Sequence, residues 1–193
     1  MIHPDTELRY INNVIGYGVF ATKLIPKGTI TWVLDHFDQT FTQEEIDQLD
    51  PHYRSIIDWY AYIEHDGQHV LCWDHTRFVN HSCKANCFAA GFNFEIAVQD
   101  IFPNEELTND YGILNRQYDF PCACGAENCR KILKRNDIKK LYPIWDKKVQ
   151  EAFSFIPSLP QPLWNLVKEK EEMATVLKKP PSTLKYFYST EKI

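Results

Sequence analysis

The amino-acid sequence predicts a mostly β fold of short strands and small curved sheets, followed by a helical C-terminal extension. Up to about residue 135, short runs of β-branched and aromatic residues alternate with Gly, Pro and Asn, a pattern typical of a compact all-β body. After Asn136, large apolar residues recur at helical spacing with charged residues between them. With 193 residues, the chain is long enough to bury a hydrophobic core.

Short apolar or aromatic runs bounded by turn residues predict the strands of this body. The expected strands and hairpins cover 14–15, 19–21, 29–34, 58–64, 69–74 and 89–98. Residues 65–68 are a predicted hairpin turn, and Gly91 is the predicted turn of the 89–98 hairpin. Thr42 is the predicted N-cap of a short helix that Pro51 should end.

Two helical segments are expected in the C-terminal part. The apolar positions of the first are Ile138, Leu141, Tyr142, Trp145, Val149 and Phe153. Three prolines then interrupt the pattern before an amphipathic segment at 163–177. We therefore expect a β domain at 1–120, a cysteine-containing segment at 121–135 and a helical extension at 136–193. The extension either recognises a substrate or partner, or forms a packed lid on the β body.

The charge of the chain limits its partners. Its formal net charge of −5 argues against nucleic-acid binding, which relies on clustered Lys and Arg, and suits a basic protein partner. Residues 1–30 lack a basic start followed by an apolar run, and no window has the ~18 apolar residues of a membrane span. We therefore expect a cytoplasmic protein without membrane binding. The sequence does not determine the oligomeric state.

Half of the six cysteines cluster tightly, at Cys122, Cys124 and Cys129. Their Cys-x-Cys-x4-Cys spacing favours a structural zinc site, which needs a fourth ligand from elsewhere. The candidates for that ligand are Cys72, Cys83 and Cys87. The alternative is a group of buried free thiols. No His accompanies the cluster, which argues against a catalytic zinc site.

The most informative segment is 77–86, with the sequence Arg-Phe-Val-Asn-His-Ser-Cys-Lys-Ala-Asn. Asn80 and His81 follow two apolar residues and would be costly to bury without hydrogen bonds. They are either satisfied structural groups or part of a binding site. The glycine pair at Gly16 and Gly18 either forms an ordinary turn or lets the backbone approach a ligand closely.

Together with the run Glu-Leu-Thr-Asn-Asp-Tyr-Gly at 106–112, these segments resemble the SET-domain protein lysine methyltransferases over roughly residues 8–135. The resemblance implies a SET-type fold that transfers methyl groups from S-adenosylmethionine to a lysine of a protein substrate, such as a basic protein or tail. The implied cofactor-binding residues are Gly16, Tyr17, Gly18, Tyr60, Arg77, Asn80 and His81. The implied ligands of a structural Zn²⁺ in a post-SET segment are Cys83, Cys122, Cys124 and Cys129. The compact length resembles that of the small, stand-alone bacterial members.

Tyr111 holds the position of the family's catalytic tyrosine. A lysine amine must be neutral to attack a methyl group, although free Lys has a pKa near ~10.4. A dry channel disfavours the ammonium form, and the Tyr111 hydroxyl can orient the amine. For any single tyrosine the alternative is a core aromatic residue with a satisfied hydroxyl. Glu106 and Asp110 are expected to be structural.

Three positions depart from the pattern of many relatives. Asn109 stands where they have a Phe or Tyr that influences how many methyl groups are added, so the degree of methylation is not assigned. The strand at 29–34 lacks their Tyr-x-Gly, so Trp32 or Tyr60 is expected to form one wall of the substrate channel. Ala85 replaces the usual Pro, which affects the rigidity of a turn.

Two other functions are consistent with parts of the pattern. A cofactor-binding, SET-like module could bind a peptide with little activity, but intact Asn80, His81 and Tyr111 argue against it. A zinc-knuckle nucleic-acid-binding protein is the second alternative. The acidic balance argues against it, although the Lys and Arg residues between 131 and 140 form a local positive patch.

Overall fold

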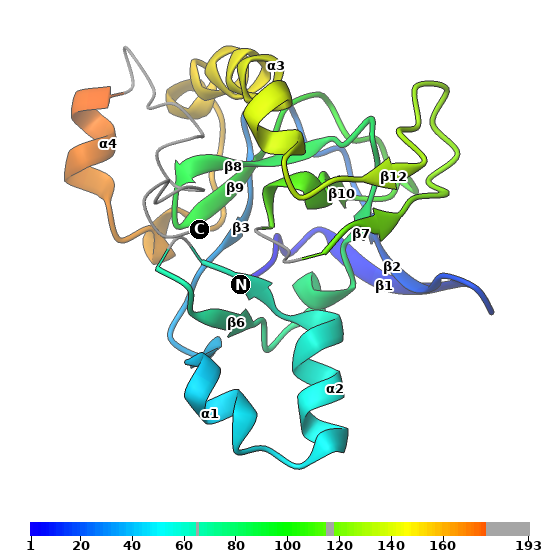
Figure 1. The fold of residues 1–193 in the computed structure, drawn as a ribbon. Helices are drawn as coiled ribbons and strands as arrows, with labels where there is room; N and C mark the ends of the chain where they lie inside the picture. Colours follow the sequence, from blue (N-terminus) through cyan, green and yellow to red (C-terminus); the bar gives the residue numbers. More distant parts are fainter. Residues whose placement is uncertain (65, 115–117, 177–193) are drawn as a thin grey trace.

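A computed structural model describes residues 1–64, 66–114 and 118–176 of the chain. Within these residues the strands form several small sheets of two or three strands each (Figure 1). This arrangement confirms the predicted mostly β fold. Among the described residues, no helix combines the length and the apolar character that crossing a bilayer requires.

The central sheet has the order β3-β9-β8 and is antiparallel. Its strands are β3 (Ile30–Val33), β8 (Cys87–Phe92) and β9 (Phe94–Ala97). Successive side chains of a strand point to opposite faces. Phe94 and Ile96 therefore share one face, where they belong to the core cluster that α3 (Asp137–Phe153) completes.

A second antiparallel sheet has the order β4-β6-β5 and lies near α1 and α2 (Figure 1). Its strands are β4 (Gln39–Phe41), β5 (Tyr62–Ile63) and β6 (His69–Leu71). The two helices are α1 (Gln43–Asp47) and α2 (Pro51–Tyr60). Both sheets contribute side chains to the cavity described below.

The remaining strands form three pairs. They are the antiparallel hairpin β1 (Thr6–Asn12) with β2 (Gly16–Ala21), the parallel pair β7 (Asn80–His81) with β10 (Thr108–Asn109), and the antiparallel pair β11 (Phe120–Pro121) with β12 (Ile132–Leu133). The short 3₁₀ helices are η1 (His75–Phe78), η2 (Tyr111–Ile113), η3 (Ile156–Ser158) and η4 (Trp164–Leu166). A last helix, α4, covers Lys170–Val176.

The main hydrophobic core lies between the central sheet and α3, which crosses β8 and β9 in Figure 1. Phe153 is fully buried, and its ring stacks on those of Phe92 and Phe94 at centroid distances of 6.0 and 6.4 Å. Met173 of α4 joins the same cluster. The described part of the helical extension therefore packs on the β body, which agrees with the second of the two alternatives from the sequence, a packed lid.

The helix expected after Thr42 is confirmed, because Thr42 and Glu45 form a capping box. The short helix ends before Pro51, as expected, but the prediction missed a second helix that begins at this residue. Pro51 begins α2, where its fixed φ suits the first turn and Asp50 caps the helix by accepting from the His52 amide. The predicted strand at 58–64 is consequently helical up to Tyr60, and only β5 is extended.

The hairpin predicted at 89–98 is present, but Gly91 is not its turn. Gly91 has φ +77° and lies within β8, where the register shifts between Ala89 and Phe92 as in a β-bulge. The turn lies at Asn93. In the second helical segment, α4 begins only at Lys170, and Leu177 lies outside the described residues.

Candidate functional site

The parallel pair β7–β10 brings two distant segments together. Thr108 lies opposite Asn80, and Asn109 lies opposite His81. The buried Asn86 stabilises this pair, because its side-chain amide donates to the Glu106 carbonyl at 2.8 Å and its side-chain oxygen accepts from the Thr108 amide at 2.8 Å. The polar residues of the two sequence runs are thereby held at one place in the fold.

Asn80 joins this pair to the segment 16–18, called the glycine turn below. This segment opens β2 directly after the hairpin turn at 13–15, where the sequence predicts a strand at 14–15. Its Nδ2 donates to the Tyr17 carbonyl oxygen at 2.9 Å and to the Glu106 carboxylate at 2.7 Å. A Cβ atom on Gly18 would overlap that carboxylate and lie 2.7 Å from Cδ1 of Ile11. Glycine is therefore required here by close packing, and burial raises the pKa of Glu106 although the Asn80 hydrogen bond opposes this.

Tyr111 is anchored by both its backbone and its hydroxyl. Its amide donates to Nδ1 of His81 at 3.1 Å, and its hydroxyl donates to the Val79 carbonyl oxygen at 2.9 Å. Asp110 caps η2 by accepting from the Gly112 amide and forms an ion pair with Arg130. The phenol is thus fixed beside the strand that carries Asn80 and His81, and Asp110 has the structural role expected for it.

Aromatic rings surround Phe78, next to this site. The ring centroids of Tyr17 and Tyr60 lie 5.9 and 5.5 Å from that of Phe78, and the Arg77 guanidinium lies 5.4 Å from it. The residues predicted to bind a cofactor therefore come together. Gly16, Tyr17 and Gly18 meet Asn80, while Tyr60 and Arg77 lie around Phe78 and His81 contacts Tyr111.

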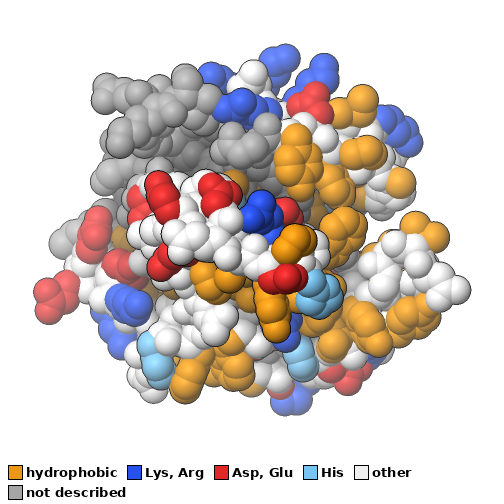
Figure 2. Space-filling model, turned by 60° about the horizontal axis from the view of Figure 1, so that its bottom comes forward, with side chains coloured by type: hydrophobic (Ala, Val, Ile, Leu, Met, Phe, Trp, Pro, Cys, Tyr) orange, Lys and Arg blue, Asp and Glu red, His pale blue; other side chains and the backbone are white. Residues whose placement is uncertain are grey.

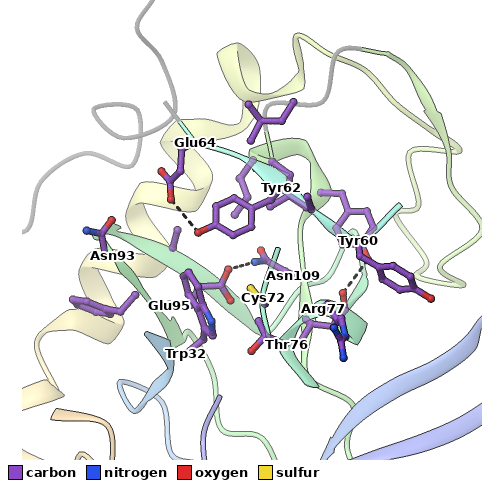
Figure 3. Close-up of a pocket in the computed structure, with 18 of the residues that line it drawn as sticks. Trp32, Tyr60, Tyr62, Glu64, Cys72, Thr76, Arg77, Asn93, Glu95 and Asn109 are labelled. Carbon is purple, nitrogen blue, oxygen red and sulfur yellow. Dashed lines mark hydrogen bonds between the residues drawn. The ribbon is translucent and has the colours of Figure 1, made fainter. Parts of the chain in front are cut away.

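A cavity of about 110 Å³ lies between the two three-stranded sheets, α2 and the Tyr111 segment. Figure 3 shows side chains from these elements around it. Its lining includes Trp32, Tyr60, Tyr62, Thr76, Arg77, Glu95, Asn109 and Tyr111. Trp32 and Tyr60, the two expected wall residues, both line it. Trp59 also lines it and is 70% exposed, so the cavity opens to the surface beside α2.

Glu95 is the lining residue that sequence reasoning missed. Asn109 donates a hydrogen bond to its carboxylate, as Figure 3 shows. Burial raises the pKa of Glu95 to about 7, and the Asn109 hydrogen bond only partly opposes this. In the sequence, Glu95 between Phe94 and Ile96 has the alternation of an ordinary strand with a polar outer face. No local signal indicates that this outer face is covered by another sheet.

Figure 2 views the molecule with the end that carries α1 and α2 turned forward, and orange hydrophobic side chains are spread over much of this face. The large exposed aromatic side chains of α2 are Tyr53 and Trp59. Phe37 and Trp73 are also exposed, and their ring centroids lie 5.3 Å apart. Exposed apolar surface beside a cavity is typical of a binding face.

Cysteine thiols and one imidazole form a possible metal site beside β7. The ligand atoms of His81, Cys83, Cys122 and Cys124 all lie within 4.8 Å of one another. The Sγ atoms of Cys83 and Cys122 are 3.9 Å apart, and that of Cys129 is 3.6 Å from that of Cys122. Of the candidates for a fourth ligand, Cys83 lies in the cluster. Cys72 lines the cavity and Cys87 is buried in a separate apolar cluster.

The model of one protein family, the SET domain, matches residues 16–112, which is half of the chain. The chain belongs to the SET-domain family. The matched range contains the glycine turn, β7, β10 and Tyr111, so the predicted recognition is confirmed on the residues that carried it.

Several curated relatives of this SET domain are histone-lysine N-methyltransferases. Human SETD1B is 31% identical over 134 residues, which cover 63% of this chain and 7% of the human protein. Drosophila melanogaster SETD1 is 28% identical over 140 residues, covering 66% of this chain and 8% of the fly protein. The SET domain described here thus corresponds to a small part of each of these relatives.

Solved structures with similarity to this SET domain include KRYPTONITE in complex with mCHH DNA, an H3(1-15) peptide and SAH, at 22% identity and a TM-score of 0.48. That match covers 68% of this chain and 30% of KRYPTONITE. The methyltransferase domain of human SETMAR matches at 22% identity and a TM-score of 0.46, covering 69% and 58% of the two chains.

Proposed function

We propose that this SET domain is a protein-lysine N-methyltransferase that uses S-adenosylmethionine as its methyl donor. The observation that carries the proposal is the position of Tyr111. Its phenol lines the cavity and is hydrogen-bonded to the Val79 carbonyl, directly before the Asn80-His81 pair that contacts the glycine turn. A substrate side chain in the cavity and a cofactor at the turn would then meet at this phenol.

The residues around the glycine turn fit the proposed cofactor. Oδ1 of Asn80 accepts no hydrogen bond from any described residue, so it is free to accept one from the amino group of a methionine moiety. The rings of Tyr17, Tyr60 and Phe78 offer faces for an adenine or a sulfonium group. When bound, S-adenosylmethionine supplies an electrophilic methyl group.

Within the proposal, the chain aligns the lysine amine and keeps it dry. Aromatic walls exclude water, which disfavours the ammonium form of the lysine. The Tyr111 hydroxyl is held by the Val79 carbonyl, and its oxygen can accept a hydrogen bond from the amine and thereby orient the nitrogen lone pair. In this proposal Tyr111 positions the amine and does not take its proton.

We further propose that Cys83, Cys122, Cys124 and Cys129 hold one structural Zn²⁺. A tetrahedral zinc with Zn–S bonds of about 2.3 Å places its sulfur ligands about 3.8 Å apart, close to the separations of 3.9 and 3.6 Å observed here. His81 is the competing ligand, with Nε2 3.3 Å from the Cys83 sulfur. We favour Cys129, because Nδ1 of His81 accepts a hydrogen bond from the Tyr111 amide, so the proton of the neutral ring lies on Nε2 and leaves that nitrogen no lone pair for a metal.

The proposed substrate is a lysine in a basic protein or tail. The net charge of −5 supports a basic partner, and the relatives named above are histone-lysine methyltransferases. The division into a SET domain at 1–120, a post-SET segment at 121–135 and a C-terminal extension, expected to be helical, at 136–193 belongs to the same proposal. A cytoplasmic location remains a prediction of the sequence.

The test is methyl transfer from labelled S-adenosylmethionine to proteins of a lysate, with the wild type and a Tyr111→Phe variant. We expect label on lysine, a loss of at least about 100-fold in the variant, and binding of S-adenosylmethionine within about twofold of wild type. Tyr53→Phe, at an exposed tyrosine of α2, is the matched control and should retain activity. Cofactor binding without transfer by the wild type would instead favour the peptide-binding module.

A further inference from the structure

The carboxylate of Glu95 lies in the cavity and forms no ion pair with any of the described residues. Phe94 and Ile96 point into the core under α3, so the alternation of β9 turns Glu95 to the opposite face, toward the cavity. Its one hydrogen bond among the described residues comes from Asn109, and no described Lys, Arg or His forms an ion pair with it. The Arg77 guanidinium, which also lines the cavity, lies against the Phe78 ring.

The Glu95 side chain is half-buried, and enclosing a carboxylate without a cation is costly because it removes water that stabilises the charge. The charge of Glu95 acts to raise the pKa of Tyr62, Cys72 and Cys87 on neighbouring elements. Glu64, which accepts from the Tyr62 hydroxyl, is a second carboxylate in the lining of the cavity. Neither the phenol nor the thiols can offset a negative charge. Among the described residues, no cationic side chain contacts Glu95, so a cationic ligand could supply the missing positive charge.

The cavity has the other features of an amine site. Trp32 and Tyr62 pack edge to face at 5.9 Å, so aromatic rings border the space next to the carboxylate in Figure 3. The Thr76 hydroxyl lines the cavity and has no hydrogen-bond partner among the described residues. A water needs about 10–15 Å³ of such space, so 110 Å³ accommodates a chain of several heavy atoms.

We propose that Glu95 binds the ε-ammonium group of the target lysine inside the cavity and accepts its proton, with Asn109 as the positioning residue that orients the carboxylate. The N–H bond of the ammonium breaks, its electron pair stays on nitrogen, and the proton forms an O–H bond with Glu95. The neutral amine can then react, and Glu95 returns the proton to solvent. This inference rests on the proposed function and adds a proton acceptor to it.

The binding test uses n-butylammonium chloride as a mimic of the lysine side chain and 1-butanol as its uncharged counterpart, with tryptophan fluorescence or calorimetry as the readout and no cofactor present. We expect wild type to prefer the ammonium by about tenfold at pH 8, since hydrogen bonds to charged groups are among the stronger ones. The preference should rise with pH through about 7, where Glu95 ionises.

Glu95→Gln should remove both the preference and its pH dependence while 1-butanol binding persists. Glu95→Leu is the second variant, since an apolar residue can replace a buried carboxylate without loss of folding. Glu44→Gln, which removes an exposed carboxylate of α1, is the charge-matched control and should keep the preference. Asn109→Ala should move the pH midpoint upward, because the Asn109 hydrogen bond lowers the pKa of Glu95.

The outcomes separate this inference from the proposed function. An unchanged ammonium preference in both Glu95 variants overturns the inference, even if the wild type methylates lysine. An ammonium preference that depends on Glu95, in a wild type that transfers no methyl group, supports the amine site and contradicts the proposed function.

Discussion

At the scale of single residues, Gly18 shows how closely the candidate cofactor turn is packed. It has an ordinary φ, so the reason for glycine is steric: a Cβ atom would meet the Glu106 carboxylate, which Asn80 also contacts. Gly16 differs, because its φ of +82° strains other residues while the space around it is open. The two glycines at the start of β2 are therefore needed for different physical reasons.

A Gly18→Ala variant should bind S-adenosylmethionine about tenfold more weakly, because overpacking costs about 1–3 kcal/mol and displaces the Asn80–Glu106 pair. Calorimetric titration of the folded variant measures this. Gly67→Ala is the control, since Gly67 has a φ of +86° but nothing within 4 Å. If Gly18→Ala binds S-adenosylmethionine as tightly as the control does, close packing at Gly18 does not contribute to cofactor binding.

Glu95 should make the stability of the fold depend on pH. In the unfolded chain a Glu titrates near ~4.5, whereas the folded protein holds the Glu95 proton up to about pH 7. Between these values the folded state binds more protons, so the free energy of unfolding falls as pH rises. The free energy of unfolding of Glu95→Gln should therefore exceed that of the wild type by up to about 3 kcal/mol at pH 8 and by little at pH 4.

Urea unfolding of both proteins across that pH range measures the difference, with Glu44→Gln as the control at an exposed site. If the free energies of unfolding of wild type and Glu95→Gln differ by the same amount at every pH, Glu95 titrates alike in the folded and unfolded states.

At the scale of elements, the cysteine segment is held to β7 by the thiol cluster. β11 and β12 form only a two-residue pair, which is too short to be stable alone. The amide of Cys83 donates to the Cys124 sulfur at 3.4 Å, and the Arg130 amide donates to the Cys83 sulfur at 3.4 Å. A bound metal would join these elements far more firmly than such contacts do.

We expect purified protein to contain about one Zn²⁺ per chain and chelation to lower its Tm, because a structural metal contributes to folding free energy. Cys129→Ser should at least halve the zinc content, measured by elemental analysis. Cys87→Ala, at the buried thiol outside the cluster, should retain the metal. Full metal content in Cys129→Ser, with loss in His81→Asn, would assign the fourth ligand to His81.

At the scale of the whole molecule, the SET body and the helical extension share one core. The face of β8 and β9 that carries Phe92 and Phe94 would be exposed without α3, and Phe153 fills the space above these rings. On the opposite face of the same sheet lies the cavity with Glu95. The extension therefore supports the sheet that forms one wall of the candidate site.

Phe153→Ala should destabilise the whole protein by about 3–5 kcal/mol, because the substitution leaves a cavity in the core. Ile144→Ala, on the exposed side of α3, should cost less than about 1 kcal/mol. Urea denaturation followed by tryptophan fluorescence measures both. Equal effects would mean that α3 does not share the core of the SET body.

The sequence by itself determined the family, the mostly β fold and the residues that meet at the site. Asn80, His81 and Tyr111 could be found because each lies in a short run whose residue order is distinctive. The Thr42 helix could be predicted from local capping chemistry. The omission of the helix that begins at Pro51 has the same local origin, since a proline can end one helix and begin the next.

Only the tertiary structure decided where Gly91 and Asn93 bend the chain, that His81 lies beside the cysteine cluster, and what Glu95 faces. These features depend on segments that are distant in sequence. β7 pairs with β10, and β5 and β9 belong to different sheets that both line the cavity. A strand pattern distinguishes its two faces but does not show what lies above each one. Glu95 has the pattern of a solvent-facing residue, and the second sheet encloses it with Asn109 in a cavity.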